Sequence, residues 1–225
     1  MGNSGSKQSV SPKVIVAMPA YNEADYISSL VLQARHYADE VIVADDGSSD
    51  QTAKIAELAG ATVIRHERNE GKGVAIQNIL VEAIKKNTDI LVLLDADGQH
   101  DPSEIPSLIQ AVSEGSDLVI GSRNIGRDNI PSYRKVGQKV LSYLTGTLSK
   151  TKVSDTESGF RALSRKAISA MHLKESGFAI ESEMISEAST KGLKIVEVPI
   201  TAIYTKDGST LNPIKHGVGN LNRIM

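Results

Sequence analysis

The sequence predicts an open α/β sheet with helices packed on it, and two observations lead to this class. Short apolar runs of strand length alternate with segments of helical periodicity, and short loops join them. Such alternation is typical of parallel sheets with right-handed crossovers. The run at 90–94 is apolar at consecutive positions, which is typical of a strand buried on both faces of a sheet.

Each element of the first half follows from a local pattern. Pro19 should end the first strand, and Asn22 should cap the helix that follows it. Asp101 should cap another helix, with Pro at the first helical position and Glu104 at the third. We expect strands at 14–18, 41–44, 62–66, 90–94 and 117–121, and helices at about 24–37, at about 51–58, from the 69–73 loop to about 86, and from 102 onward.

The second half is less regular, and no linker separates it from the first. We expect a polar loop at 123–131, a helix at 133–149, a short strand at 158–163, a helix capped by Ser164, a helix carrying Glu181, Glu183 and Glu187, and a last strand at 194–204. The chain of 225 residues is therefore expected to form a single domain over 13–210. Residues 1–12 should be a disordered tail, and 211–225 a C-terminal tail of amphipathic character.

Composition excludes several classes of protein. The chain has no cysteine, so disulfide scaffolds and thiolate metal sites are excluded. A net charge of -2 provides no bulk attraction to nucleic acid. No apolar run approaches the roughly 20 residues that span a bilayer, and no signal peptide is visible. A cytoplasmic location is expected.

The stretch 91–100 holds the clearest chemical signal, because an apolar strand ends there in two carboxylates. Asp95 and Asp97 are two residues apart, so an extended backbone projects both side chains to one side. Since Asp101 serves as the helix cap, these two acids are left for another role. Clustered carboxylates at the carboxyl end of a strand are typical ligands of Mg²⁺ or Mn²⁺ shared with substrate phosphates. Tyr21, Asp45 and Asp46 follow other strands and should converge on the same crevice.

Six motifs in order carry a resemblance to a known family. The chain resembles family 2 glycosyltransferases of the GT-A fold, and within them the dolichol-phosphate mannose synthase group. That fold is a Rossmann-like, mixed, mostly parallel sheet flanked by helices. The motifs are Pro19-Ala20-Tyr21-Asn22-Glu23, Asp45-Asp46-Gly47-Ser48-Ser49-Asp50, Gly71-Lys72-Gly73, Asp95-Ala96-Asp97-Gly98-Gln99-His100, Gly121-Ser122-Arg123 and Ser158-Gly159-Phe160-Arg161-Ala162.

The resemblance implies a site for a nucleotide-sugar donor. Pro19, Tyr21 and Glu23 match the segment that holds the nucleoside, and Asp46, or Asp45 beside it, matches the acid that binds the base.

The motif after the central strand is implied to bind the metal and the diphosphate. Asp95 and Asp97 match the metal-binding pair, Gln99 assists them, and Ala96 lies within the same donor-binding motif. Lys72 lies between two glycines at a helix start, where it would contact phosphate or remain a solvated loop lysine.

Cationic residues are implied on the acceptor side. Arg123 and Arg134 match cations that face the acceptor phosphate, and Arg161 belongs to a motif near the donor sugar and the metal. With Asp97, these arginines are the implied catalytic residues. Lys206 stands in a loop where the group often has an arginine, and a lysine is a point charge without the bidentate fork of a guanidinium.

The implied reaction is an inverting, metal-dependent transfer of a hexose or N-acetylhexosamine from a UDP- or GDP-sugar to polyprenyl (dolichyl) phosphate. A phosphate monoester with a second pKa of about 6 is already anionic near neutral pH, whereas an alcohol acceptor needs a general base. Alternatives are transfer to a saccharide hydroxyl in cell-surface polysaccharide, a sugar-1-phosphate nucleotidyltransferase, and a silent nucleotide-sugar binding module.

A lipid acceptor implies peripheral contact with the inner face of the membrane. The helix at 133–149 and the tail at 214–225 are basic and amphipathic, which suits either a bilayer surface or an ordinary packed helix. The sequence leaves homo-oligomerisation open.

Overall fold

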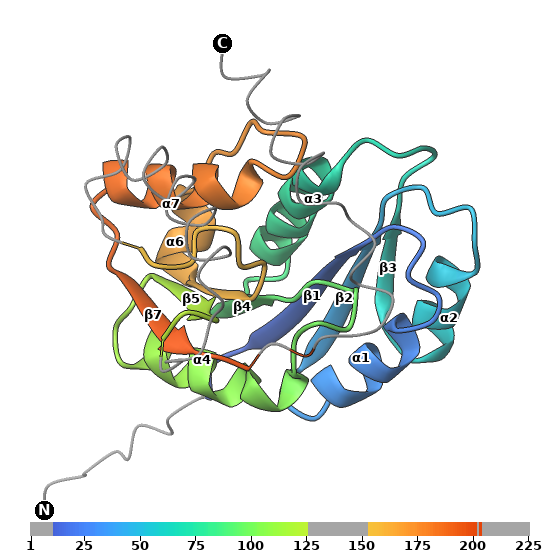
Figure 1. Cartoon of the computed structure of the whole chain (residues 1–225), viewed down its shortest axis with the longest axis horizontal. Coiled ribbons are helices and arrows are strands. Elements are labelled where there is room, and N and C mark those ends of the chain that lie inside the picture. Colours follow the sequence, from blue (N-terminus) through green and yellow to red (C-terminus); the bar gives the residue numbers. More distant parts are fainter. Residues whose placement is uncertain (1–10, 126–152, 202, 204–225) are drawn as a thin grey trace, which may run out of the picture.

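A seven-stranded sheet with helices on both faces forms the fold (Figure 1). The computed structural model describes residues 11–125, 153–201 and 203. Within them the strand order is β3-β2-β1-β4-β6-β5-β7, and β6 alone runs antiparallel to its neighbours. The expected mixed, mostly parallel α/β sheet is therefore confirmed. The predicted domain bounds of 13 and 210 remain a prediction, since part of that span lies outside the described residues.

The elements have the following bounds. The strands are β1 Val14–Ala20, β2 Glu40–Asp45, β3 Thr62–Arg65, β4 Ile90–Leu93, β5 Leu118–Ser122, β6 Arg161–Ser164 and β7 Ile195–Pro199. The helices are α1 Ile27–Ala34, α2 Thr52–Leu58, α3 Lys72–Lys85, the 3₁₀ turn η1 Pro102–Glu104, α4 Ile105–Ser113, α6 Arg165–Ala170 and α7 Ile180–Thr190.

Alternate residues of the strands point to opposite faces of the sheet and pack into two apolar layers. In β1, Val16 and Met18 pack with α1, α2 and α4 on one face, whereas Ile15 and Ala17 pack with α3, α6 and α7 on the other. Figure 1 shows these two groups of helices on opposite sides of the sheet. Because both faces are covered, the central strands carry apolar residues at every position. No helix in the described ranges is long and apolar enough to cross a bilayer.

The start of the chain corrects two expectations. Pro19 does not end β1 but lies within it, in register with Ala44 of β2. Its missing N–H faces the β4 side, where the pairing with β1 has already ended at Ala17 and Leu93. Asn22 does not cap a helix either: it has φ 58°, and its side-chain oxygen accepts a hydrogen bond from the Ser49 amide.

The turn before α4 has Asp101, Pro102 and Glu104 at the predicted cap, first and third positions. Asp101 accepts a hydrogen bond from the Ser103 amide at 2.9 Å, as a cap should. Glu104 does not return to the cap, because its carboxylate accepts from the Thr201 amide beyond β7. Ser164 caps α6 through the Ala167 amide, as expected.

Two strands of the second half are shorter than expected, since β6 begins at Arg161 and β7 ends at Pro199. The expected helix at 133–149 and both expected tails lie outside the described residues, apart from positions 11 and 12.

Candidate active site

A pocket of about 430 Å³ opens at the carboxyl ends of β1, β2 and β4. The chain runs from β1 to β2 and β3 on one side and then crosses to β4 on the other, so the strand order reverses beside β1. Ligands of open α/β sheets bind at such a reversal. The lining residues are Pro19, Ala20, Tyr21, Glu23, Asp46, Asn69, Gly71, Lys72, Ala75, Asp95, Ala96, Asp97 and Phe178.

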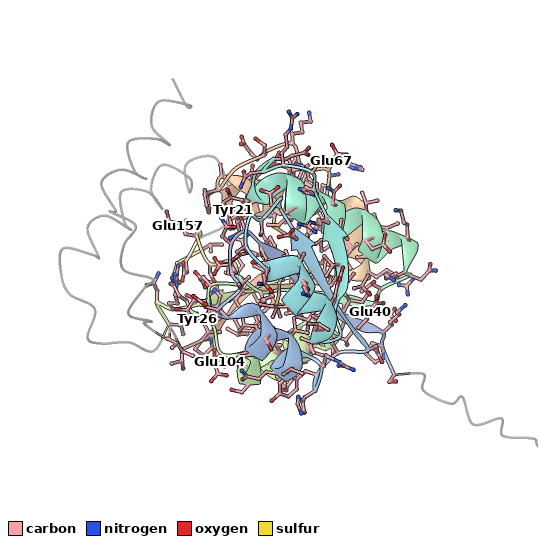
Figure 2. The ribbon with its side chains drawn as sticks, turned by 90° about the vertical axis from the view of Figure 1, so that its right-hand side faces the viewer. Tyr21, Tyr26, Glu40, Glu67, Glu104 and Glu157 are labelled. Atoms are coloured by element: carbon pink, nitrogen blue, oxygen red, sulfur yellow. The ribbon has the colours of Figure 1, made fainter. Side chains whose placement is uncertain are left out.

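Most of the expected donor-side residues meet in this pocket. Eight of the lining residues were singled out from the sequence, and they come from four separate motifs: Pro19, Tyr21, Glu23, Asp46, Lys72, Asp95, Ala96 and Asp97. In Figure 2, Tyr21 and Glu157 lie toward one end of the molecule, whereas Glu40, at the beginning of β2, lies toward the opposite end.

Asp46 fixes the loop that leads into α3. Its carboxylate accepts hydrogen bonds from His66 Nδ1 at 2.7 Å and from the amides of Glu70 and Gly71 at 2.8 Å each. The other imidazole nitrogen of His66 lies 2.8 Å from Asn78 Nδ2. Because the Asn78 amide donates to this nitrogen, the Asp46 contact is the one in which the imidazole donates. Asp46 therefore shapes one wall of the pocket through three polar contacts.

Asp45 takes a different position from its neighbour. It is fully buried at the end of β2, neither carboxylate oxygen has a hydrogen-bond partner, and Arg65 Nε lies 3.5 Å away. Asp45 does not line the pocket, whereas Asp46 does. Of the two acids between which the sequence left the choice open, Asp46 is therefore the one placed to meet a ligand.

Asp95 is held by a lysine. Lys72 Nζ lies 2.6 Å from Asp95 Oδ1 and 2.6 Å from Glu181 Oε1, so one ammonium bridges two carboxylates. Burial by itself would raise the pKa of Asp95, but the Lys72 charge and nearby His100 hold that pKa well below its usual range. The same two carboxylates raise the pKa of Lys72 against the opposing effect of its burial. Both groups are therefore charged at neutral pH.

Asp97 and Glu23 carry excess negative charge at the pocket. Burial and the Asp95 charge raise the pKa of Asp97, against one hydrogen bond from the Gln99 amide. Burial, followed by the charges of Asp97, Asp50 and Asp95, raises the pKa of Glu23 from 4.5 to about 7. A cation placed here would stabilise the ionised form of each group.

The donor set suits a hard divalent cation. In the part of the chain that the structure describes, no group of three His, Asp or Glu side chains is arranged to enclose a metal. Mg²⁺ seldom needs such a cage, because one or two carboxylates, water and substrate phosphates complete its coordination. Asp95 and Asp97 supply hard oxygens beside the pocket, so they fit this pattern. Gln99 is not among the lining residues; its backbone amide donates to Asp97 Oδ1, and its carbonyl accepts from the Ile203 amide.

Arg123, which was expected on the acceptor side, is already paired in this structure. Arg123 donates from Nε and Nη2 to the Asp155 carboxylate at 2.8 Å each, while its side chain stays 28% exposed. Part of the Arg123 side chain therefore stays accessible to solvent at the end of β5. Arg134 and Lys206 lie outside the described residues.

Arg161 lies beneath the site. It is 1% exposed and donates to the backbone carbonyls of Ser158 at 2.8 Å, Glu181 at 2.6 Å and Thr156 at 2.9 Å. Burial lowers the pKa of its guanidinium. The side chain does not line the pocket, so its contacts are those of a residue that joins segments of the chain.

Part of the pocket wall comes from the segment before α7, which the sequence did not single out. The Gly73 amide donates to the Ser176 carbonyl at 2.8 Å, and a Cβ on Gly73 would overlap the Glu175 carbonyl. This close approach brings Phe178, 64% exposed, to the pocket, with its ring centroid 5.9 Å from Lys72 Nζ. Gly71 and Gly73, on either side of Lys72, are the sequence feature that could have indicated this contact, because a close approach of two backbone segments requires glycine.

This fold and pocket define an α/β protein whose candidate ligand site lies at the strand-order reversal, beside a carboxylate pair. The chain belongs to glycosyl transferase family 2, whose model matches residues 15–171. The family and the GT-A type of fold that the motifs indicated are thereby confirmed.

Relatives of known name are similar over most of the chain. The UDP-N-acetylglucosamine–dolichyl-phosphate N-acetylglucosaminyltransferase of Methanococcus voltae is 36% identical, over 86% of this chain and 86% of its own. The dolichol-phosphate mannosyltransferase of Pyrococcus furiosus is 37% identical, over 84% of this chain and 56% of its own.

A solved structure shares the fold. Glucosyl-3-phosphoglycerate synthase from Mycobacterium tuberculosis, in complex with Mn²⁺, UDP and phosphoglyceric acid, aligns with a TM-score of 0.74 at 24% identity. The alignment covers 95% of this chain and 75% of that one.

Proposed function

We propose that this glycosyltransferase moves a hexose or N-acetylhexosamine from a UDP- or GDP-sugar to a polyprenyl phosphate, with inversion and with Mg²⁺ or Mn²⁺. The observation that carries the proposal is one pocket in which the motif expected to hold the nucleoside and the carboxylate pair meet. The names of relatives that act on dolichyl phosphate support the acceptor class.

Donor binding is assigned to the pocket residues. Pro19, Tyr21 and Glu23 would hold the nucleoside, and Asp46 lies where a base would approach. Asp95 and Asp97 would hold the divalent cation together with the donor's phosphates. When bound, that cation neutralises the negative charge that builds on the leaving diphosphate.

Transfer then needs an acceptor oxygen on the far face of the sugar. An oxygen of the acceptor phosphate forms a bond to the anomeric carbon as the bond to the donor diphosphate breaks, and that electron pair leaves with the nucleoside diphosphate. The acceptor phosphate is anionic near neutral pH, so no proton has to be removed from it. The exposed edge of the Arg123 fork would orient it, and Arg134 and Lys206 are further candidates.

A lipid acceptor would place the enzyme at the membrane surface. We propose peripheral contact with the cytoplasmic face, where the lipid-linked monosaccharide would serve glycosylation. The segments proposed for this contact, 133–149 and 214–225, lie outside the described residues.

The test is transfer of label from UDP-glucose, UDP-N-acetylglucosamine or GDP-mannose to polyprenyl phosphate in detergent with Mg²⁺ or Mn²⁺. We expect label in the organic phase with one of these donors, and its loss in Asp97→Ala. Asp101→Ala is the matched control, because it removes a nearby carboxylate that caps a turn. Label that appears only in a water-soluble glycan would reject the lipid acceptor, and full turnover in Asp97→Ala would reject the metal site.

A further inference from the structure

The Lys72 ammonium is in contact with Asp95, one of the two acids proposed to hold the divalent cation. Its nitrogen lies 2.6 Å from Asp95 Oδ1, and both side chains line the same pocket. An ammonium and a divalent cation in contact with the same carboxylate oxygen repel each other, so each weakens the binding of the other. Any cation that binds Asp95 therefore has to compete with Lys72.

The Asp95 carboxylate has little room to turn away from Lys72. A Cβ at Gly159 would overlap both Asp95 oxygens, so the carboxylate packs closely against that backbone. His100 Nε2 lies 3.7 Å from Asp95 Oδ2, and the His100 side chain is buried. The carboxylate is thus confined between Gly159, His100 and Lys72, and the lysine is the flexible member of this group.

Glu181 provides Lys72 with a second anionic partner. Its Oε1 also lies 2.6 Å from the ammonium, and its side chain is 6% exposed. The backbone of Glu181 is held in place, because it lies in the first turn of α7 and its carbonyl accepts a hydrogen bond from Arg161. A lysine that leaves Asp95 can therefore keep its contact with Glu181 and remain at the pocket.

We propose that Lys72 is a built-in counter-ion that neutralises Asp95 until a divalent cation replaces it, and that Glu181 retains the displaced ammonium. This inference rests on the proposed metal site. If Lys72 neutralises Asp95, a divalent cation should bind only weakly in the absence of the donor. A donor diphosphate favours the exchange because it supplies new negative charge for the released lysine, so metal and donor should bind cooperatively.

The test measures Mn²⁺ binding to the full chain without nucleotide, by electron paramagnetic resonance of free Mn²⁺. We expect Lys72→Met to bind Mn²⁺ about tenfold more tightly than the wild type, since close buried charge pairs couple by at least this factor. Lys86→Met is the matched control: Lys86 caps the other end of α3 and pairs with Glu40 and Glu82, so its loss removes the same charge without freeing Asp95.

A second variant tests the same competition in the opposite direction. Glu181→Gln leaves Lys72 with Asp95 as its charged partner in this cluster, so Mn²⁺ should bind more weakly than to the wild type. This variant also covers the case in which Lys72→Met fails to fold. Equal or weaker Mn²⁺ binding by folded Lys72→Met would overturn the inference, as would tighter or unchanged binding by Glu181→Gln.

The same titration separates this inference from the proposed function. If wild type with UDP binds no Mn²⁺, or if Asp97→Ala binds it as the wild type does, the metal site is wrong and the counter-ion role is overturned with it. If binding requires Asp97 but does not respond to Lys72→Met, the metal site stands and the counter-ion role alone is overturned.

Discussion

Replacement of Arg161 by methionine distinguishes a structural role from a catalytic one. The guanidinium donates three hydrogen bonds, of 2.6 to 2.9 Å, to the carbonyls of Ser158, Thr156 and Glu181, and it is 1% exposed. Methionine fills much of the same space but donates nothing. Each buried carbonyl left without a donor costs about 1–3 kcal/mol.

The expected loss is smaller than the sum of three such costs. Burial of the guanidinium is itself unfavourable, as its lowered pKa indicates, and methionine removes that cost. We therefore expect Arg161→Met to lower the free energy of unfolding by about 3 kcal/mol. For a chain of this size that corresponds to a fall of roughly 6–12 °C in Tm.

Urea and thermal unfolding followed by circular dichroism would measure this loss. Arg165→Met is the control, because Arg165 is on the same strand–helix connection but pairs with Asp89 at the surface, where an ion pair is worth at most about 1 kcal/mol. A variant at position 161 that unfolds like the wild type yet transfers no sugar would refute the structural role and place Arg161 on the substrate.

Three further predictions concern the carboxylates of Glu23, Asp101 and Asp155. The pKa of Glu23 is raised from 4.5 to about 7, so the free energy of unfolding should fall as pH rises through that window. Glu23→Gln should flatten this part of a curve of stability against pH, and an unchanged curve would contradict the shift. Asp101→Ala should cost about 1 kcal/mol in urea unfolding, since the Ser103 amide loses its acceptor, and a loss near zero would mean that this cap is not needed. Asp155→Asn should raise the acceptor KM about tenfold while the donor KM is unchanged, because the Arg123 fork loses its charged partner; steady-state kinetics that show a change in the donor KM alone would place Arg123 elsewhere.

The sequence by itself determined the α/β class, most of the strands and the acids that end them. Apolar runs at 14–18, 41–44 and 90–94 specify buried parallel strands, because burial on both faces leaves no room for polar alternation. The carboxyl ends of such strands share one edge, so the sequence predicts that Asp46 and Asp95 lie together, and both line the pocket.

The tertiary structure alone decided which charged groups are free and which are already paired. Lys72 meets Asp95 and Glu181 from three different elements, and Arg123 meets Asp155 across 32 positions of the chain. Such pairings depend on how closely packed segments approach one another, and neither residue spacing nor periodicity encodes that distance. Local patterns therefore identify which residues reach the pocket, while their charge state and freedom to bind a ligand are set by neighbours that only the folded chain brings into contact.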